Sequence, residues 1–349
     1  MSKLKIAYFG TPSFSAQFLE LILNDKNLPV EIVLVVTQPD KPVGRNHILT
    51  PSPVKEVAKK HNIRITYNSS DFIKAIGGPT RGAPTTGAVE QDVRARVGAV
   101  EGQNLSPTID LSLLFAYGEM IPKDLLTIPR LGFWNIHPSL LPAYRGASPI
   151  TYPILLGDAE TGVTLMQMDD QLDHGPIIAQ EKIKILPNDR RTDLEDKLTQ
   201  LAFHVFKVFI NPLTHEPVNA LTLTKQDDSL ATFTRQLKKS DGFIPFKTLK
   251  RTLAGQSLLQ EESPQILQEY YSKNNPAIKQ FDNATIYNLF RSLYPWPGIW
   301  TLVMINGFQK RLKITDMEMK NNTLFIAKVQ LEGKNEVDFE TFKRAYNVF

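Results

Sequence analysis

The chain has 349 residues, of which 42% are hydrophobic, with a formal net charge of +4 and no cysteine. This length allows two domains with packed cores, and the lack of cysteine excludes disulfides and a thiol nucleophile and fits a reducing compartment. No apolar run reaches the roughly 18 residues that a membrane helix needs. The first residues lead directly into a strand-like segment, so we expect a cytoplasmic protein without a signal or transit peptide and without membrane contact. Six His without Cys partners and no HExxH sequence predict that there is no metal site.

The first part of the sequence alternates apolar segments with helical patterns. Strands are predicted at residues 5–10, 30–38, 63–70 and 109–118, and helices at 11–24 and 51–62. This alternation predicts an α/β fold with a doubly wound, mostly parallel sheet. Ligands bind outside the carboxyl ends of the strands in such sheets, so Gly10, Gln38, Tyr117 and Asn135 are expected to converge there.

The rest of the sequence departs from this alternation. Residues 77–103 hold six of the 19 Gly, which predicts a surface insertion. The segment 211–246 has the composition of an exposed linker. After it, a helical pattern at 283–300 and short strands predict a small β-barrel or half-barrel; the strands are expected at 300–305, 311–319 and 323–331. We therefore expect domains at 1–211 and 241–349, joined by a linker at 212–240.

Charge is distributed unevenly along the chain. From residue 230 onward there are 17 Lys and Arg against 11 Asp and Glu, a net charge of +6, whereas the first 229 residues carry −2. A basic C-terminal third suggests contact with a polyanion. A lysine-rich solvated surface explains the same charge, and the charge alone does not separate the two interpretations.

The stretch "WNIHPSLLPAYRGASPI" (134–150) carries the clearest chemistry. Asn135 and His137 have alternate spacing, so on a strand they share one face. An amide donor beside an imidazole can receive a carbonyl oxygen that becomes an oxyanion. Asp173, in "MDDQLDHGPI", would hold a nearby His in its charged form and accept a proton. Because no Ser or Cys nucleophile is evident, we expect attack by a substrate amine or by water.

These motifs resemble a known family. "NIHPSLLPAYRGASPI" together with "GDAETGVTLMQMDDQLDHGPI" is similar to the formyltransferases that use 10-formyltetrahydrofolate. "FGTPSFSAQFLELIL" and "TQPDKPVGRNHILTPSPVKEVAKKHNI" narrow the resemblance to the subfamily that acts on methionyl-tRNA, and the C-terminal blocks "YPWPGIW" and "VQLEGKNEVDFETF" fit the same subfamily. The resemblance covers nearly all of residues 4–230 except the insertion, and the remainder more loosely.

The resemblance implies a reaction and a set of site residues. It implies transfer of the formyl group of 10-formyltetrahydrofolate, a folate co-substrate, to the α-amino group of methionyl-initiator tRNA, by a Rossmann-like catalytic domain, a tRNA-binding C-terminal domain and a monomeric chain. Matched residue by residue, the catalytic group is Asn135, His137 and Asp173. The folate-binding group is Phe115, Tyr117, Gly118, Ser139, Leu140, Leu141, Pro142 and Asp170. Arg45 matches a basic residue that enters the acceptor end of the tRNA, and Lys41 is suited to phosphate contact.

Three departures from the family pattern leave alternatives open. The segment 77–103 and residues 250–280 exceed the usual pattern, and strands that normally complete the C-terminal barrel are missing after residue 319, which predicts a reduced barrel. The nearest alternative enzyme is a sugar-nucleotide N-formyltransferase, which shares the catalytic group but accepts an amino sugar. The alternative from another class is a tRNA-binding protein with impaired catalysis.

Overall fold

The computed structural model describes residues 3–44, 47–76, 109–214, 222–258, 262–274 and 281–349. They divide into two compact units, each drawn from three separate parts of the sequence. The first unit takes residues 1–142, 162–182 and 196–230, and the second takes 143–161, 183–195 and 231–349. The boundaries predicted at 211 and 240 stay predictions, and the expected insertion at 77–103 lies outside the described residues.

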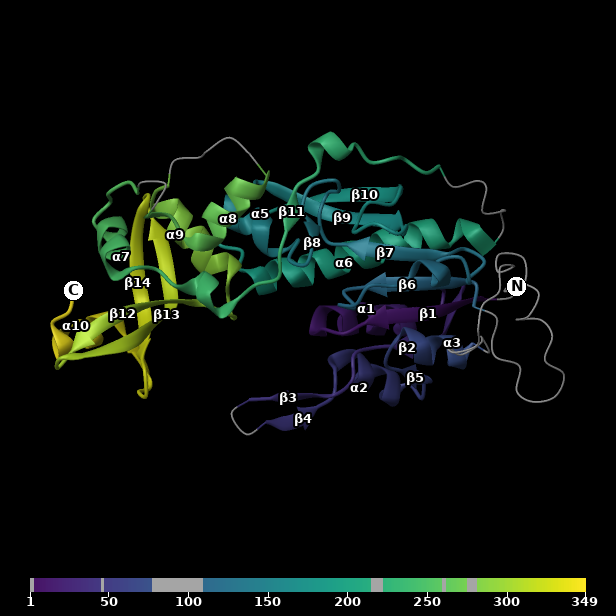
Figure 1. The fold of residues 1–349 in the computed structure, drawn as a ribbon, viewed down its shortest axis with the longest axis horizontal. Helices are drawn as coiled ribbons and strands as arrows, with labels where there is room; N and C mark the ends of the chain where they lie inside the picture. The colour runs from purple at the N-terminus through teal and green to yellow at the C-terminus, as the bar shows by residue number, and fades with distance from the viewer. Residues whose placement is uncertain (1–2, 45–46, 77–108, 215–221, 259–261, 275–280) are drawn as a thin grey trace, which may run out of the picture. The chain divides into compact units, whose positions relative to one another are not determined.

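The first unit is built on a seven-stranded sheet (Figure 1). Parallel pairs join β5 to β2, β2 to β1, β1 to β6 and β6 to β7, whereas β7 and β9 are antiparallel. The predicted doubly wound, mostly parallel sheet is confirmed; the strands β9 and β10 were not predicted. The strand order is β10 (Ile177–Lys184), β9 (Glu160–Gln167), β7 (Phe133–His137), β6 (Leu111–Phe115), β1 (Leu4–Gly10), β2 (Val30–Val36) and β5 (Ile65–Thr66).

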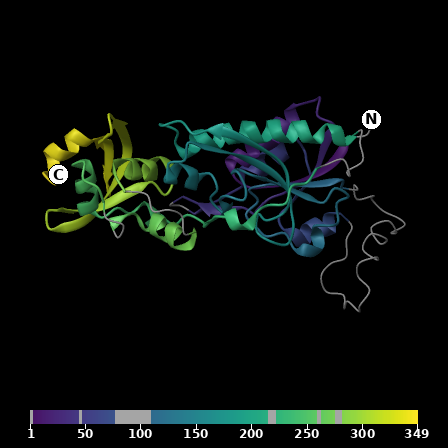
Figure 2. The same ribbon diagram turned by 90° about the horizontal axis from the view of Figure 1, so that it is seen from above.

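Helices cover both faces of this sheet (Figure 2). On one face, Phe18 of α1 (Ser13–Asn24) contacts Tyr8 of β1 and Phe206 of α6 (Arg191–Ile210). On the other face, Phe72 of α3 (Ser69–Ala75) packs against Phe9. Successive residues of a strand point to opposite faces. Because both faces are covered, β1 can be apolar throughout its length.

Helix α2 (Pro53–Lys60) lies within the helix predicted at 51–62 and begins at a proline. The Ser52 hydroxyl accepts a hydrogen bond from the backbone N–H of Lys55 at 3.0 Å, which caps the helix. Between β2 and α2, the antiparallel strands β3 (Lys41–Val43) and β4 (Ile48–Thr50) form a hairpin. The side chains of Ile48 and Leu49 are exposed on it.

The second unit contains an antiparallel sheet in the order β12 (Ile299–Ile305), β13 (Phe308–Lys320), β14 (Thr323–Leu331) and β15 (Glu336–Asp338). The three predicted strands are confirmed, and β15 is a fourth. Asn321 and Asn322 alone connect β13 to β14, both with positive φ, as in a two-residue hairpin turn. The family pattern has further strands at this point, whereas here β13 leads directly into β14.

Helices complete the core of this unit. They are α5 (Thr151–Leu156), α7 (Phe246–Leu253), α8 (Gln265–Asn274), α9 (Asn283–Ser292) and α10 (Phe339–Tyr346). Helix α8 lies in the segment that exceeds the family pattern, yet its Ile266, Leu267 and Tyr270 are buried in the core. Helix α8 is thus part of the packed interior of the unit.

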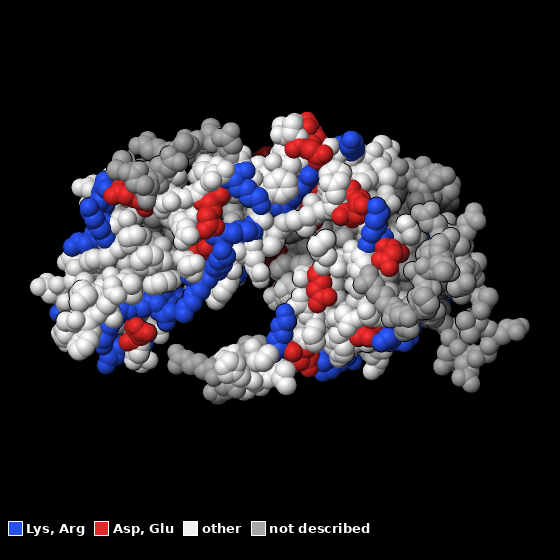
Figure 3. Space-filling view, viewed as in Figure 1, with Lys and Arg blue, Asp and Glu red and all other residues white. Residues whose placement is uncertain are grey.

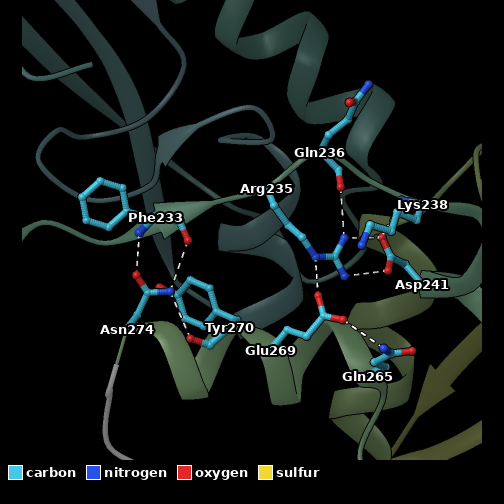
Figure 4. A network of polar contacts seen from close by, with 9 residues as sticks. All are labelled: Phe233, Arg235, Gln236, Lys238, Asp241, Gln265, Glu269, Tyr270 and Asn274. Carbon is cyan, nitrogen blue, oxygen red and sulfur yellow. Dashed lines mark hydrogen bonds and ion pairs between the residues drawn. The ribbon is translucent and has the colours of Figure 1, made fainter. Parts of the chain in front are cut away.

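Polar contacts fix the chain before α7 (Figure 4). Two short strands, β8 (Arg145–Gly146) and β11 (Phe233–Thr234), pair in parallel. The guanidinium of Arg235 donates two hydrogen bonds of 2.8 Å to the carboxylate of Asp241 in the 3-10 turn η5 (Lys239–Gly242), and a third to Glu269 of α8. The Asn274 side chain bonds both backbone groups of Phe233. Helix α8 thereby holds the segment around β11.

Candidate active site

Strand β7 brings two polar side chains to the carboxyl edge of the first unit's sheet. Asn135 and His137 are 6% and 4% exposed, and their alternate positions put them on the same face. Strand β9 lies beside them, with Met166 opposite Asn135 and Thr164 opposite His137. Water therefore reaches these two side chains only to a small extent, which strengthens their electrostatic interactions.

Asp173 joins this pair from the turn between β9 and β10. Its Oδ1 accepts a hydrogen bond from Asn135 Nδ2 at 3.2 Å and lies 3.6 Å from His137 Nδ1. The Asp173 side chain is 11% exposed. The structure thus brings together the three side chains that the sequence singled out, although Asp173 is 38 residues from Asn135 in the sequence.

The loop after β7 is fixed by side chains that sequence reasoning missed. The Thr164 hydroxyl donates to the Ser139 carbonyl at 2.7 Å and accepts from the Leu141 N–H at 3.1 Å. Gln180 Nε2 donates to the Leu141 carbonyl at 2.6 Å and to Thr164 at 2.9 Å. Thr164 and Gln180 lie on β9 and β10, so only a prediction of these strands next to β7 would have placed them here. They hold the segment Ser139, Leu140, Leu141 and Pro142 in one backbone conformation.

The neighbouring strand ends converge as the sequence predicted. The Tyr117 carbonyl accepts hydrogen bonds from Thr11, just after β1, at 2.8 Å and from Gln38, just after β2, at 3.3 Å. Gly118 has φ +89°, and a Cβ there would lie 2.8 Å from the Gln38 amide nitrogen. Glycine is therefore required where the backbone passes Gln38.

Phe115 and Tyr117, the aromatic residues predicted to line the folate site, present different groups to a ligand. The Phe115 side chain is buried against Phe14 and Phe18 of α1, so its backbone is what it can offer to a ligand. Burial raises the pKa of Tyr117, and the nearby Glu119 carboxylate adds to the shift. The Tyr117 hydroxyl is therefore neutral and acts as a hydrogen-bond donor.

Asp170 lies in the turn that carries Asp173, and its side chain is exposed to solvent. Its carboxylate lies 2.7 Å from Lys123 Nζ, and this contact holds the pKa of Asp170 below its ordinary value. In the same turn, His174 lies between two further carboxylates, and Gln226 Nε2 donates to the carbonyls of Asp173 and Gly175 at 2.9 and 2.8 Å. Sequence reasoning missed His174 and Gln226; the second falls in a stretch that has the composition of a linker.

Of the residues expected to meet tRNA, Lys41 is exposed on β3 and contacts the Gln38 side chain, whereas Arg45 lies outside the described residues.

Within the described ranges, no group of three or more His, Asp or Glu side chains is arranged to hold a metal ion. No helix in the same ranges is long and apolar enough to cross a membrane.

A family model described as formyl transferase matches residues 4–209. The chain belongs to the formyl transferase family. It is 34% identical to the methionyl-tRNA formyltransferase of Geobacter metallireducens over 86% of this chain and 76% of that one. It is 30% identical to the methionyl-tRNA formyltransferase of Caldicellulosiruptor saccharolyticus over 99% and 98% of the two chains.

A solved structure shares the fold of this family member. It is the N-formyltransferase of Helicobacter canadensis in complex with folinic acid and dTDP-3-aminofucose, with a TM-score of 0.51 and 17% identity over 97% of this chain and 99% of that one. At this identity the likeness is one of fold.

Proposed function

We propose that this chain transfers the formyl group of 10-formyltetrahydrofolate to the α-amino group of methionyl-initiator tRNA. The observation that carries the proposal is the meeting of Asn135, His137 and Asp173 at the carboxyl edge of the sheet, inside the family domain. Relatives called methionyl-tRNA formyltransferase match 86% and 99% of the chain, which favours methionyl-tRNA over an amino sugar as the acceptor and an enzyme over a protein that only binds tRNA.

The three side chains have complementary roles in this reaction. The amine nitrogen attacks the formyl carbon, and the carbonyl oxygen becomes an oxyanion that Asn135 and the imidazolium of His137 stabilise. One Asn135 N–H is engaged by Asp173, so the second N–H of the amide is the one directed to the oxyanion. Asp173 balances the charge of His137 and accepts the amine proton, directly or through water. The bond between the formyl carbon and N10 of the folate then breaks, and N10 takes a proton.

The folate is proposed to lie mainly against backbone, with Asp170 as the one charged side chain among the proposed contacts. Residues Ser139 to Pro142 are held by Thr164 and Gln180, and Gly118 allows close approach of the chain next to Tyr117. Asp170, at the turn, completes the proposed pocket. Because these backbone groups are already fixed, binding of the folate requires little ordering of the protein.

The acceptor tRNA is proposed to contact basic residues of both units. Figure 3 shows Lys and Arg gathered in a band across the face that carries η5 and the β12–β13 pair of the second unit. Lys238 and Lys239 are exposed at η5, and Lys310, Arg311 and Lys313 lie on β13. In the first unit, Lys41 lies on β3, and Arg45, four residues later in the sequence, is outside the described residues. Binding through such residues neutralises phosphates, so tRNA affinity should fall steeply with salt.

Formylation of methionyl-tRNA by the purified chain, with an amino-sugar nucleotide as competing acceptor, tests the proposal. We expect formylmethionyl-tRNA as the product, and little activity in Asn135→Ala, His137→Ala and Asp173→Ala. His204→Ala is the matched control, because that histidine is 62% exposed on α6. Near-full activity in the three site variants, or preference for the sugar acceptor, would contradict the assignment. The cytoplasmic location and the monomeric state stay predictions.

A further inference from the structure

The backbone at Asp173 adopts a conformation that its own sequence does not favour. Its φ is +48°, in the left-handed region that a residue with a Cβ rarely occupies. Two positions later, a Cβ at Gly175 would lie 1.9 Å from the Gln167 carbonyl, so the turn is pressed against the end of β9. Such a conformation persists when surrounding contacts impose it.

Those contacts come from the segment 226–228 on either side of His174. Gln226 Nε2 holds the carbonyls of Asp173 and Gly175, the residues before and after His174. The His174 ring lies between two carboxylates, with Nδ1 2.6 Å from Asp169 Oδ2 and Nε2 3.4 Å from Asp228 Oδ2. Asp169 belongs to the same turn, whereas Asp228 belongs to the 3-10 turn η4 (Asp228–Leu230). His174 therefore links the turn that carries Asp173 to η4.

We propose that His174 is the positioning residue for Asp173: its imidazolium, bound to Asp169 and Asp228, holds the turn that presents the Asp173 carboxylate to Asn135 and His137. The proposal rests on the function proposed above. It deepens that function by adding a side chain that acts on the reaction without touching the substrates.

The chemistry of imidazole makes this link depend on protonation. A neutral ring has one N–H donor and one lone pair, so it can donate to one carboxylate and must turn its lone pair towards the other. The imidazolium donates to both. The surrounding charges favour this form, since acidic groups outnumber basic ones around the ring: Asp169, Asp228 and Asp170 face it, Asp173 is adjacent in the sequence, Asp227 lies next to Asp228, and Lys123 is paired with Asp170.

Loss of the His174 proton should therefore weaken the contact with Asp228 and loosen the turn. The His174 side chain is 21% exposed, so its proton exchanges with solvent. As pH rises through the titration of His174, we expect kcat to fall more than either KM changes, because the turn presents Asp173, whereas Asp170, the one proposed folate contact in this turn, is also held by Lys123.

Three variants test this expectation over a pH range. We expect His174→Gln to lower kcat about tenfold at neutral pH, with the ratio of wild-type to variant kcat falling towards one as pH rises. Asp228→Asn should keep kcat at neutral pH and exceed the wild type at alkaline pH, because its amide N–H can donate to the lone pair of the neutral ring. Asp227→Asn is the matched control: its carboxylate accepts bonds from the N–H and hydroxyl of Ser229, at 3.0 and 2.7 Å, and we expect the wild-type profile.

A second readout uses no substrate. Hydrogen exchange of residues 169–175 in the full chain should lose protection as pH rises, beyond the intrinsic pH dependence of exchange, in the wild type but not in Asp228→Asn. This result would support the role of His174 even if the chain formylated another acceptor, which would refute the proposed function alone. A ratio of wild-type to His174→Gln kcat that is the same at neutral and alkaline pH, or exchange at residues 169–175 that is the same in wild type and His174→Gln, would overturn the proposal.

Discussion

Asp173 is the residue on which the candidate site depends. Its carboxylate accepts the Asn135 amide and faces His137, so it both orients the first and balances the charge of the second. Asp173→Asn keeps the shape and an acceptor oxygen for Asn135 but removes the negative charge and the proton acceptor. Loss of general-base assistance alone is worth about 10²- to 10⁴-fold, and we expect a fall in kcat of that order. Single-turnover formylation measures it, with folate binding as the control for an intact pocket; a change of less than threefold would contradict the role.

Thr164 supports the site through its hydroxyl. It donates to the Ser139 carbonyl and accepts from the Leu141 N–H, both buried, and it also accepts from the part-buried Gln180 amide. Thr164→Val has nearly the same shape but leaves these groups without their partner. We expect a loss of about 1–3 kcal/mol in the free energy of unfolding, measured in urea, and a higher KM for the folate. Unchanged stability would show that water replaces the hydroxyl.

The residues of the candidate site differ in how far the sequence reveals them. Asn135 and His137 are readable because alternation on a strand fixes their common face. Thr164 depends on the antiparallel pairing of β9 with β7, and Gln226 reaches Asp173 across 53 residues of sequence. No local pattern encodes such contacts. Long-range pairing therefore sets the limit of what the sequence predicts here.

Among the elements, the β3–β4 hairpin is held at its base by an ion pair. Lys55 Nζ, in the first turn of α2, lies 2.6 Å from Asp40 Oδ1 and 5.0 Å from the centre of the Tyr67 ring. The hydrogen bond that Lys55 donates to Asp40, with a further contribution from Tyr67, raises the pKa of Lys55 above its ordinary value. The ion pair therefore fixes the chain immediately before the β3–β4 hairpin, which carries the proposed tRNA contact Lys41.

Removal of that ion pair should weaken binding of the acceptor tRNA and leave binding of the formyl donor unchanged. We expect Lys55→Met to raise the KM for methionyl-tRNA about tenfold, equivalent to about 1.4 kcal/mol, while the KM for 10-formyltetrahydrofolate stays the same. Steady-state kinetics with each substrate varied separately gives both values. Lys59→Met on the same helix is the matched control, because its pair with Glu56 is more than half exposed and contributes little. Equal effects of the two variants would show that Lys55 does not anchor the hairpin.

Helix α8 shows that a segment beyond the family pattern can belong to the core. Residues 250–280 exceed the family pattern, yet Tyr270 stacks with Tyr144 and packs at a tilt against Tyr152 in the core of the second unit. Its pattern of Ile266, Leu267 and Tyr270 is short, and the partners that bury these side chains come from other parts of the chain. Apolar spacing within the segment is therefore a weak signal for α8, because the contacts that bury the helix come from residues far away in the sequence.

At the scale of the whole molecule, the fold class was predictable and the assignment of segments to units was not. Alternating apolar and helical patterns define the parallel part of the sheet because each strand is buried on both faces. The second unit, however, takes residues 143–161 and 183–195 from the middle of the sequence. Composition changes along the chain mark linkers, but they carry no information on which distant segments pack together.

Residues 77–103 provide the last prediction, because they interrupt the chain between two well-packed elements. They lie outside the described residues, as do residues 104–108, but Ile76 after α3 and Ile109 before β6 are buried in the same hydrophobic cluster. A segment poor in large apolar residues cannot offset the entropy of its own ordering. Removal of 77–103, with residues 104–108 kept as the connection, should therefore leave folding intact and formyl transfer within about tenfold, or 1.4 kcal/mol.

Urea unfolding and initial rates measure the two effects. Removal of α8, whose side chains are in the core, is the contrasting control and should abolish folding of the second unit. If the shorter chain fails to fold, residues 77–103 contribute to the core; if it loses tRNA affinity alone, they bind the acceptor.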